Sequence, residues 1–255
     1  AMFVLFDSCW HPFPRSGRQR EPELHTHNSC WVQSPGVDIL RSPARFAALE
    51  DYVTGIVSHF GNDPRVHAWD LWNEPDNENT NAYGMRDLPG CKGDIVLPLM
   101  AQATGWVRQA APSQPLTIGV WTGDWSPRRI TPFHRLQLGV SDVISFHRYA
   151  DANATQADID LLRAHGRPLL CTEYMARGAG STFEAILPVF CEESVGAYNW
   201  GFVAGRSQTQ YPWDSWNRAY DAPPELWFHD IFHPSGEPYL ANEVAFIRRI
   251  TGAER

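Results

Sequence analysis

Two glutamates stand at the ends of strand-like runs and have the chemistry of a catalytic pair. Glu74 ends the run Ala-Trp-Asp-Leu-Trp-Asn-Glu that starts at residue 68, and Glu173 ends Leu-Leu-Cys-Thr-Glu, which starts at residue 169. Cleavage of a glycosidic bond needs one carboxylic acid to protonate the leaving oxygen and one carboxylate to attack or stabilise the anomeric carbon. The two glutamates are therefore candidates for such a pair.

The elements that must position this pair alternate along the chain. Strands are predicted at residues 3–6, 66–72, 116–121, 143–146, 168–172 and 195–200. Helices are predicted at residues 43–60, 95–111, 155–165, 182–191 and 242–251. Continuous apolar strands that alternate with helices indicate an α/β fold with a parallel sheet covered on its outer face.

Polar residues at or just past the carboxyl ends of these strands favour a barrel over an open sheet. They are Asp7, Asn73 with Glu74, His147 with Tyr149, Glu173, and Asn199 with Trp200. The carboxyl ends of the strands form the active face of a TIM-type (β/α) barrel. The long loops at 8–42, 75–92 and 201–224 also follow strands, and long ordered loops are usually functional. We predict a single catalytic barrel domain over residues 1–255.

The segment Trp72-Asn73-Glu74-Pro75 resembles a known family. It is similar to the clan of retaining glycoside hydrolases with (β/α)₈ barrels, especially the family 5 cellulase-like members, and the resemblance extends from residue 1 to about residue 250. It implies that Glu74 is the acid/base after strand four and that Glu173 is the nucleophile after strand seven. It also implies that the Asn73 amide binds the sugar 2-hydroxyl.

The same resemblance assigns further residues to the substrate site. His147 and Tyr149 match a His-x-Tyr pair that lines the site, with the tyrosine hydroxyl touching the nucleophile, and Trp200 matches the aromatic platform after strand eight. Eleven tryptophans are more than a core of this size needs, and indole faces stack on sugar rings. We expect sugar contacts from Trp10, Trp121, Trp125, Trp200, Trp213 and Trp216, and core positions for Trp69, Trp72 and Trp106.

The chain departs from the family pattern at its front. If Glu74 follows strand four, residues 3–6 are strand three, so the barrel is expected to be incomplete, with six βα units and the first two missing. The family's strand-two arginine, which helps to keep the nucleophile ionised, is missing with them. Open sheet edges must be covered or paired, and we expect partner chains in a homo-oligomer to cover them.

Three functions remain open on this evidence. The leading prediction is a retaining glycoside hydrolase that cleaves β-glycosidic bonds in oligo- or polysaccharides. The alternatives are a catalytically silent carbohydrate-binding barrel and a purely structural remnant. An esterase or protease is disfavoured because no Gly-x-Ser-x-Gly motif is present. No glycine-rich phosphate loop is complete either, so we expect no organic cofactor and no catalytic metal.

The composition of the chain argues against several classes of ligand and binding partner. The formal charge of −8 and the isoelectric point near 5.6 argue against nucleic acid. No apolar run reaches the roughly 20 residues that span a membrane, and residues 1–6 lack a charged leader, so we expect a soluble chain and leave its localisation open. Five scattered cysteines argue against a disulfide framework. The segment with His25 and His27 could hold a metal, but a solvated loop is the simpler expectation.

Overall fold

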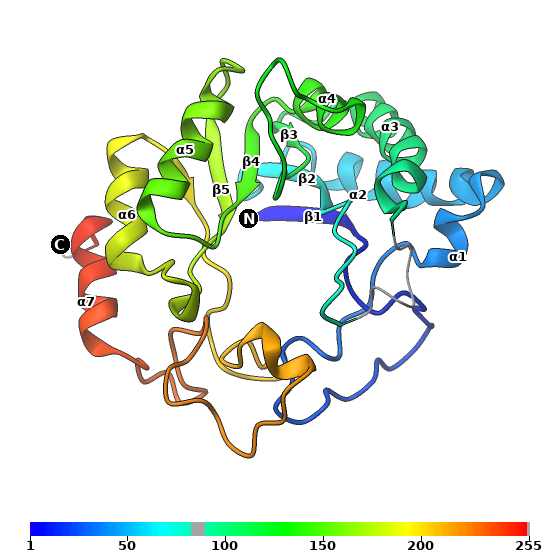
Figure 1. Ribbon diagram of the computed structural model, residues 1–255. Coiled ribbons are helices and arrows are strands. Elements are labelled where there is room, and N and C mark those ends of the chain that lie inside the picture. The colour runs from blue at the N-terminus through cyan, green and yellow to red at the C-terminus, as the bar shows by residue number, and fades with distance from the viewer. Residues whose placement is uncertain (83–89, 254–255) are drawn as a thin grey trace. The chain divides into compact units, whose positions relative to one another are not determined.

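The computed structural model describes residues 1–82 and 90–253, and these fall into two compact units. The first unit comprises Ala1–Arg18 and Val32–Ser145, and the second comprises Gln19–Trp31 and Phe146–Arg255. Figure 1 shows the course of the chain through both. Each unit is built from strands that alternate with helices, as the sequence predicted.

The first unit contains a parallel sheet of three strands in the order β1-β2-β3. These are β1 (Met2–Asp7), β2 (Ala68–Asn73) and β3 (Leu116–Thr117). Every residue of β2 is buried, as expected for the central strand of a covered parallel sheet. The register pairs Asp7 with Asn73, so the polar residues that end β1 and β2 lie side by side.

Helices cover one face of this sheet. They are α1 (Val37–Leu40), the 3-10 helix η1 (Pro43–Leu49), α2 (Glu50–Phe60), α3 (Lys92–Ala110) and α4 (Pro132–Val140). Within the unit, α2 packs against α3 and α3 against α4. Val53 and Val57, one turn apart on α2, are both fully buried in the apolar core.

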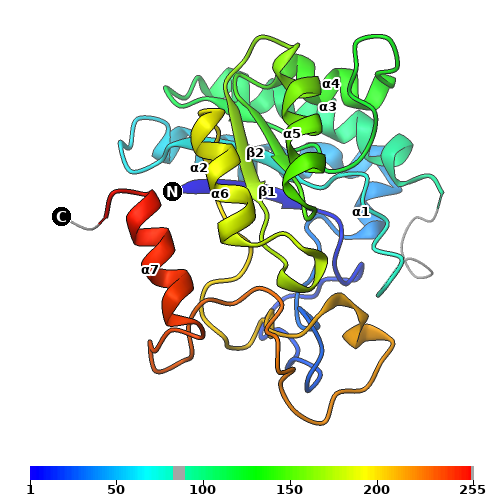
Figure 2. The same ribbon diagram turned by 60° about the vertical axis from the view of Figure 1, so that its left-hand side comes forward.

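The second unit has a three-stranded sheet in the order β4-β5-β6. The strands are β4 (Ile144–His147), whose first two residues end the first unit, β5 (Leu169–Glu173) and β6 (Gly196–Ala197). Its helices are α5 (Ala152–Arg163), η2 (Arg177–Ala179), α6 (Phe183–Glu192), η3 (Trp213–Trp216) and α7 (Ala241–Ile250). Figures 1 and 2 show α5 beside α6 and α6 beside α7.

A buried ion pair ties α7 to the loop after β5. The Arg177 guanidinium donates two hydrogen bonds to the Glu243 carboxylate, with Nε–Oε1 at 2.9 Å and Nη2–Oε2 at 2.5 Å. Arg177 also donates to the backbone carbonyls of Trp227 and Asp230. This contact joins the first turn of α7 to the rest of the second unit. Removal of either partner would leave a buried charge unpaired, which is strongly destabilising.

The predicted strands all occur, but two are shorter than expected. Residues 116–121 and 195–200 contribute only two strand residues each. Helix α4 was not predicted, although Thr131 caps it by accepting from the His134 amide and Pro132 stands at its first position. The predicted helix at 43–60 begins as the 3-10 helix η1 before it continues as α2. Trp69, Trp72 and Trp106 are buried, as predicted.

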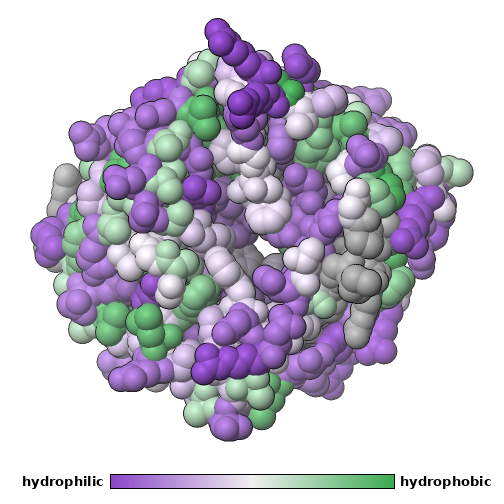
Figure 3. Space-filling model, in the orientation of Figure 1, coloured by the Kyte–Doolittle hydropathy of each residue, from purple (hydrophilic) through white to green (hydrophobic). Residues whose placement is uncertain are grey.

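The surface carries apolar side chains between polar ones. On the face drawn in Figure 3, hydrophobic residues are interspersed with hydrophilic residues. Two exposed apolar side chains of the first unit, Phe3 at 41% and Val4 at 48% exposure, lie on β1. Within residues 1–82 and 90–253, no helix combines the length and the apolar character needed to cross a membrane.

Candidate active site

Glu74 follows the last residue of β2 and is held in an uncommon backbone conformation. Its φ angle is +40°, in the left-handed region that residues other than glycine rarely adopt. The residue is only 8% exposed. The side-chain amide of Asn77 donates to Glu74 Oε2 at 2.5 Å, and the Asn77 backbone amide donates to the Glu74 carbonyl at 3.0 Å. The turn after β2 therefore fixes both the backbone and the carboxylate of Glu74.

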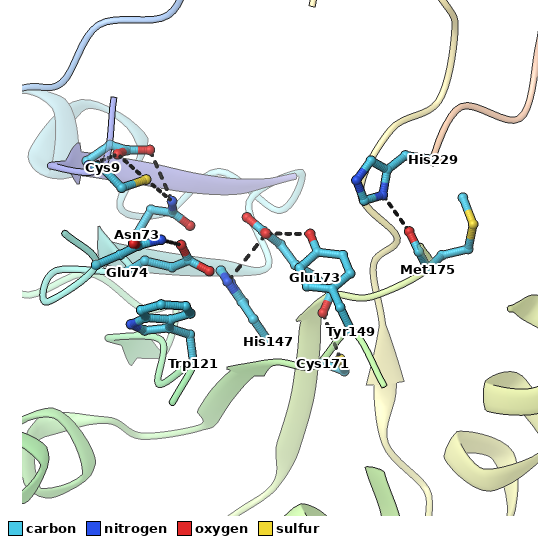
Figure 4. A network of polar contacts seen from close by, with 12 residues as sticks. Cys9, Asn73, Glu74, Trp121, His147, Tyr149, Cys171, Glu173, Met175 and His229 are labelled. Atoms are coloured by element: carbon cyan, nitrogen blue, oxygen red, sulfur yellow. Dashed lines mark hydrogen bonds and ion pairs between the residues drawn. The ribbon is translucent and has the colours of Figure 1, made fainter. Parts of the chain in front are cut away.

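Asp7, at the end of β1, organises the neighbouring side chains. Its Oδ2 accepts from the Trp10 indole at 2.8 Å and from the Asn73 amide at 3.1 Å, while its Oδ1 accepts from the Cys9 backbone amide at 3.0 Å. Burial raises the pKa of Asp7 to about 6 against the effect of these hydrogen bonds. Figure 4 shows Cys9, Asn73 and Glu74 close together. Asp7 thus joins two predicted site residues, Trp10 and Asn73.

Trp121 lies just beyond β3 and is anchored to the loop that carries Glu74. Its indole nitrogen donates to Asp76 Oδ1 at 2.8 Å, and His134 Nε2 lies 3.7 Å from Asp76 Oδ2. Trp121 remains partly exposed, as a sugar platform must be.

The prediction that Trp125 lines a groove is wrong, because this side chain is 1% exposed and belongs to the core of the first unit.

Glu173, the last residue of β5, is held by two side chains of the second unit. The Tyr149 hydroxyl donates to Glu173 Oε2 at 2.7 Å, and His147 Nδ1 lies 3.4 Å from the same oxygen. Figure 4 shows both side chains converging on this carboxylate. The His-x-Tyr pair and the glutamate therefore form one cluster, which positions one oxygen of Glu173.

Aromatic rings surround this cluster. Tyr149 makes edge contacts with Trp213 and with His229, at ring-centroid distances of 5.1 and 5.5 Å. Trp200 packs edge-on against Trp31 at 5.4 Å. All three tryptophans predicted to bind sugar in this unit, Trp200, Trp213 and Trp216, are partly exposed. Trp213 is thus placed directly beside the Tyr149–Glu173 pair.

Two buried histidines of the second unit were misjudged or missed. His27 is buried and its Nδ1 donates to the Tyr211 carbonyl at 2.9 Å, so the expectation of a solvated loop is wrong. Burial lowers the pKa of His27 to about 4. His229, which the sequence did not single out, donates from Nδ1 to the Met175 carbonyl at 2.6 Å, and burial lowers its pKa well below 6.5. Both rings are therefore neutral at pH 7.

The structure groups the predicted residues by unit. Trp10, Asn73, Glu74 and Trp121 belong to the first unit, whereas His147, Tyr149, Glu173, Trp200 and Trp213 belong to the second. Sequence reasoning missed Asp76 and Asn77, which hold Trp121 and Glu74. An asparagine in the turn just after a candidate acid was a usable signal, since asparagine side chains commonly hydrogen-bond within turns.

Helices that alternate with parallel strands, and carboxylates at the strand ends, are typical of the (β/α)-barrel glycoside hydrolases. The family model "Cellulase (glycosyl hydrolase family 5)" matches residues 23–219. The chain belongs to this family, which confirms the resemblance drawn from the Trp-Asn-Glu-Pro segment. The family's description is that of glycosyl hydrolases, and the predicted enzyme class agrees with this family.

The chain is also similar to individual proteins. A probable mannan endo-1,4-beta-mannosidase C of Aspergillus terreus is 27% identical over 99 residues, which are 35% of this chain and 24% of that protein. The endo-1,4-beta-mannanase of Rhizomucor miehei superposes with a TM-score of 0.60 at 10% identity, over 99% of this chain and 71% of that one. The endo-beta-1,4-mannanase of Thermotoga petrophila gives 0.55 at 14% identity, over 84% and 51%.

These likenesses establish the (β/α)-barrel fold. The chain spans about a quarter of the Aspergillus protein and half of the Thermotoga chain. The structural matches, at 14% identity or less, bear on the fold alone.

Proposed function

We propose that this chain is a retaining glycoside hydrolase that cleaves β-glycosidic bonds in oligo- or polysaccharides by double displacement. The observation that carries the proposal is the cluster at the end of β5. There the Tyr149 hydroxyl and the His147 ring orient one oxygen of the Glu173 carboxylate. Such a carboxylate can attack an anomeric carbon with its geometry already set, which lowers the entropic cost of the reaction.

In the proposed mechanism, Glu173 attacks the anomeric carbon and forms a glycosyl-enzyme intermediate. Glu74 protonates the departing glycosidic oxygen in this step, so that the leaving group departs as a neutral alcohol. Glu74 then accepts a proton from the water that attacks the intermediate. The anomeric configuration is retained because two inversions occur in sequence.

The remaining residues bind the sugar in this proposal. Asn73 donates its amide hydrogen to Asp7, and its side-chain carbonyl oxygen accepts a hydrogen bond from the sugar 2-hydroxyl. Trp10, Trp121, Trp200 and Trp213 offer partly exposed indole faces to pyranose rings. The names of the relatives make β-1,4-linked mannan the first substrate to test.

The arrangement of the barrel and its assembly are also proposals. We propose that β1–β6 correspond to strands three to eight of an eightfold barrel, and that residues 1–255 form one catalytic domain. Since β1 ends its sheet and carries the exposed Phe3 and Val4, we propose that a second copy of the chain covers this edge. Light scattering tests the assembly: a clean monomer at micromolar concentration contradicts it.

The activity is tested with aryl β-mannosides and β-glucosides and with soluble mannan. Proton NMR of the reaction should show the β-anomer as the first product, and an activated fluorosugar should leave a covalent adduct on Glu173 that mass spectrometry locates. A first product of α configuration would contradict retention. Tryptophan fluorescence that responds to mannan without any hydrolysis would indicate the silent sugar-binding barrel instead.

A further inference from the structure

Lys92 is the single lysine of the chain, since the other 20 of its 21 basic Lys and Arg residues are arginines. It is the first residue of α3, and its side chain is fully buried. Lysine is among the residues least often buried, because an ammonium group taken out of water needs hydrogen-bond acceptors around it. Its place in the first unit therefore calls for a physical explanation.

The Lys92 ammonium joins the two loops that follow β1 and β2. It donates to the Asn77 carbonyl at 2.6 Å and to the Ser8 carbonyl. The Ser8 hydroxyl in turn donates to the Pro75 carbonyl at 3.2 Å and accepts from the Trp72 indole at 3.0 Å. One ammonium group thus links the residue after Asp7 with the turn that contains Glu74.

Asn77 carries this link onward to the Glu74 carboxylate. Its side-chain oxygen accepts from the Asn79 backbone amide at 2.7 Å, which leaves the side-chain nitrogen to donate to Glu74 Oε2. Lys92 holds the backbone of Asn77, and Asn77 holds the carboxylate. An ammonium group has three donors on one small head, so it can donate to two carbonyls from different loops at the same time.

We propose that Lys92 is a positioning residue that sets the Glu74 carboxylate through Asn77. This inference rests on the proposed acid role of Glu74. It predicts that loss of Lys92 weakens acid catalysis, while attack on the anomeric carbon is spared. The effect should therefore depend on how much help the leaving group needs.

The test compares Lys92→Met with Glu74→Gln on two aryl β-glycosides that share a sugar. Phenol is a poor leaving group and needs a proton, whereas dinitrophenol departs without one. We expect Lys92→Met to lower kcat on the phenyl glycoside about 10- to 100-fold, with little change in the first step on the dinitrophenyl glycoside. In the double variant, no further loss should occur on the phenyl glycoside, because both changes remove the same contribution.

Gln102→Met, at an exposed position of α3, is the matched control and should behave as the unchanged protein. Equal losses on both glycosides in Lys92→Met, or additive losses in the double variant, would overturn the proposal. Asn77→Ala keeps Lys92 and removes the donor to Glu74, together with the acceptor for the Asn79 amide, so it should reproduce the leaving-group effect even if Lys92→Met fails to fold. Unchanged kinetics in Asn77→Ala would also overturn the proposal.

A spectroscopic arm separates this inference from the proposed function. Because the chain has one lysine, lysine labelled with a heavy nitrogen isotope at the ε-amine gives a single side-chain NMR signal. We expect that signal to be protected from solvent exchange and to shift in Glu74→Gln. A signal that exchanges rapidly with solvent and does not shift in Glu74→Gln would contradict the connection from Lys92 to Glu74, whether or not the protein hydrolyses a glycoside. An inactive protein with the shifted signal would instead contradict the hydrolase and keep the contact.

Discussion

The Glu74 carboxylate is held by the side-chain amide of Asn77, whose backbone is held in turn by a buried lysine, whereas the Glu173 carboxylate is held by a tyrosine hydroxyl and an imidazole ring. Glu74 itself adopts the positive φ of +40°. In the second unit Glu173 stays within its strand, and the positive φ, +74°, falls two residues later at Met175. Hydrogen bonds within a tight turn therefore fix the first carboxylate, and side-chain contacts on a regular strand fix the second. The two should respond differently to mutation.

The strongest test of this difference removes each carboxylate in turn. Glu173→Gln should lower kcat on every glycoside by about 10⁴-fold or more, as loss of a nucleophile does in other enzymes. Glu74→Gln should cost about 10²- to 10⁴-fold on the phenyl glycoside only. Steady-state and burst kinetics measure both effects. If the two variants lose activity equally on both substrates, the division of roles is wrong.

The aromatic environment of Glu173 is tested by Tyr149→Phe. This change removes the 2.7 Å hydrogen bond to the carboxylate and keeps the ring contacts with Trp213 and His229. A hydrogen bond to a charged group contributes about 1.5–3 kcal/mol, so kcat should fall about 10- to 100-fold. Tyr198→Phe, at an exposed tyrosine, is the control and should change nothing. An unchanged kcat in Tyr149→Phe would mean that Tyr149 does not orient Glu173.

The polar network of the first unit should be visible in stability against pH. Burial raises the pKa of Asp7 from 3.8 to about 6, so the folded protein binds more protons than the unfolded chain between these values. Stability is then greatest below pH 4 as far as Asp7 is concerned, and about 2 to 3 kcal/mol is lost as pH rises through 6. Urea unfolding at several pH values measures this slope.

Two variants identify the source of that slope. Asp7→Asn should remove the contribution between pH 4 and 6, because it leaves no group to titrate. Asp63 has the opposite sign, since hydrogen bonds from Arg65 lower its pKa to about 2. In the unchanged protein the contribution of Asp63 is present above about pH 4 and is lost as pH falls toward 2, so Asp63→Asn should flatten the pH dependence of stability only in that range. If stability still falls between pH 4 and 6 in Asp7→Asn, another titratable group causes the loss.

The smallest expected effect concerns Trp200, on the aromatic side of the comparison. It is partly exposed, so Trp200→Ala should weaken mannan-oligosaccharide binding, by about 1–3 kcal/mol for a lost stacking partner, with little change in Tm. Trp69→Ala is the contrast, because this side chain is fully buried and its loss should cost about 3–5 kcal/mol of stability. Calorimetry measures both. A large fall in Tm for Trp200→Ala would make Trp200 a structural residue.

The sequence predicted the strand positions and the barrel class because apolar runs and polar strand ends are local patterns. The buried strand β2 and its Asn73-Glu74 end are the clearest case. The sequence could not predict the burial of His27, since its partner, the Tyr211 carbonyl, lies 184 residues away in the chain. The same holds for Trp125 and for the Lys92–Ser8 contact, which depend on tertiary packing. Helix α4 escaped prediction because its nine residues are fewer than the window of about 11 residues over which a helical period becomes clear.

The left-handed backbone conformation of Glu74 implies a trade-off between the stability of the fold and catalytic activity. Glycine or asparagine adopts such a φ at lower cost, so Glu74→Gly should relieve strain of about 1 kcal/mol while abolishing acid catalysis. A melting temperature above that of the unchanged protein, in an inactive variant, would reveal this trade-off directly. Directed evolution for thermal stability alone should therefore drift toward loss of the acid at residue 74, and only a selection that includes turnover would keep it.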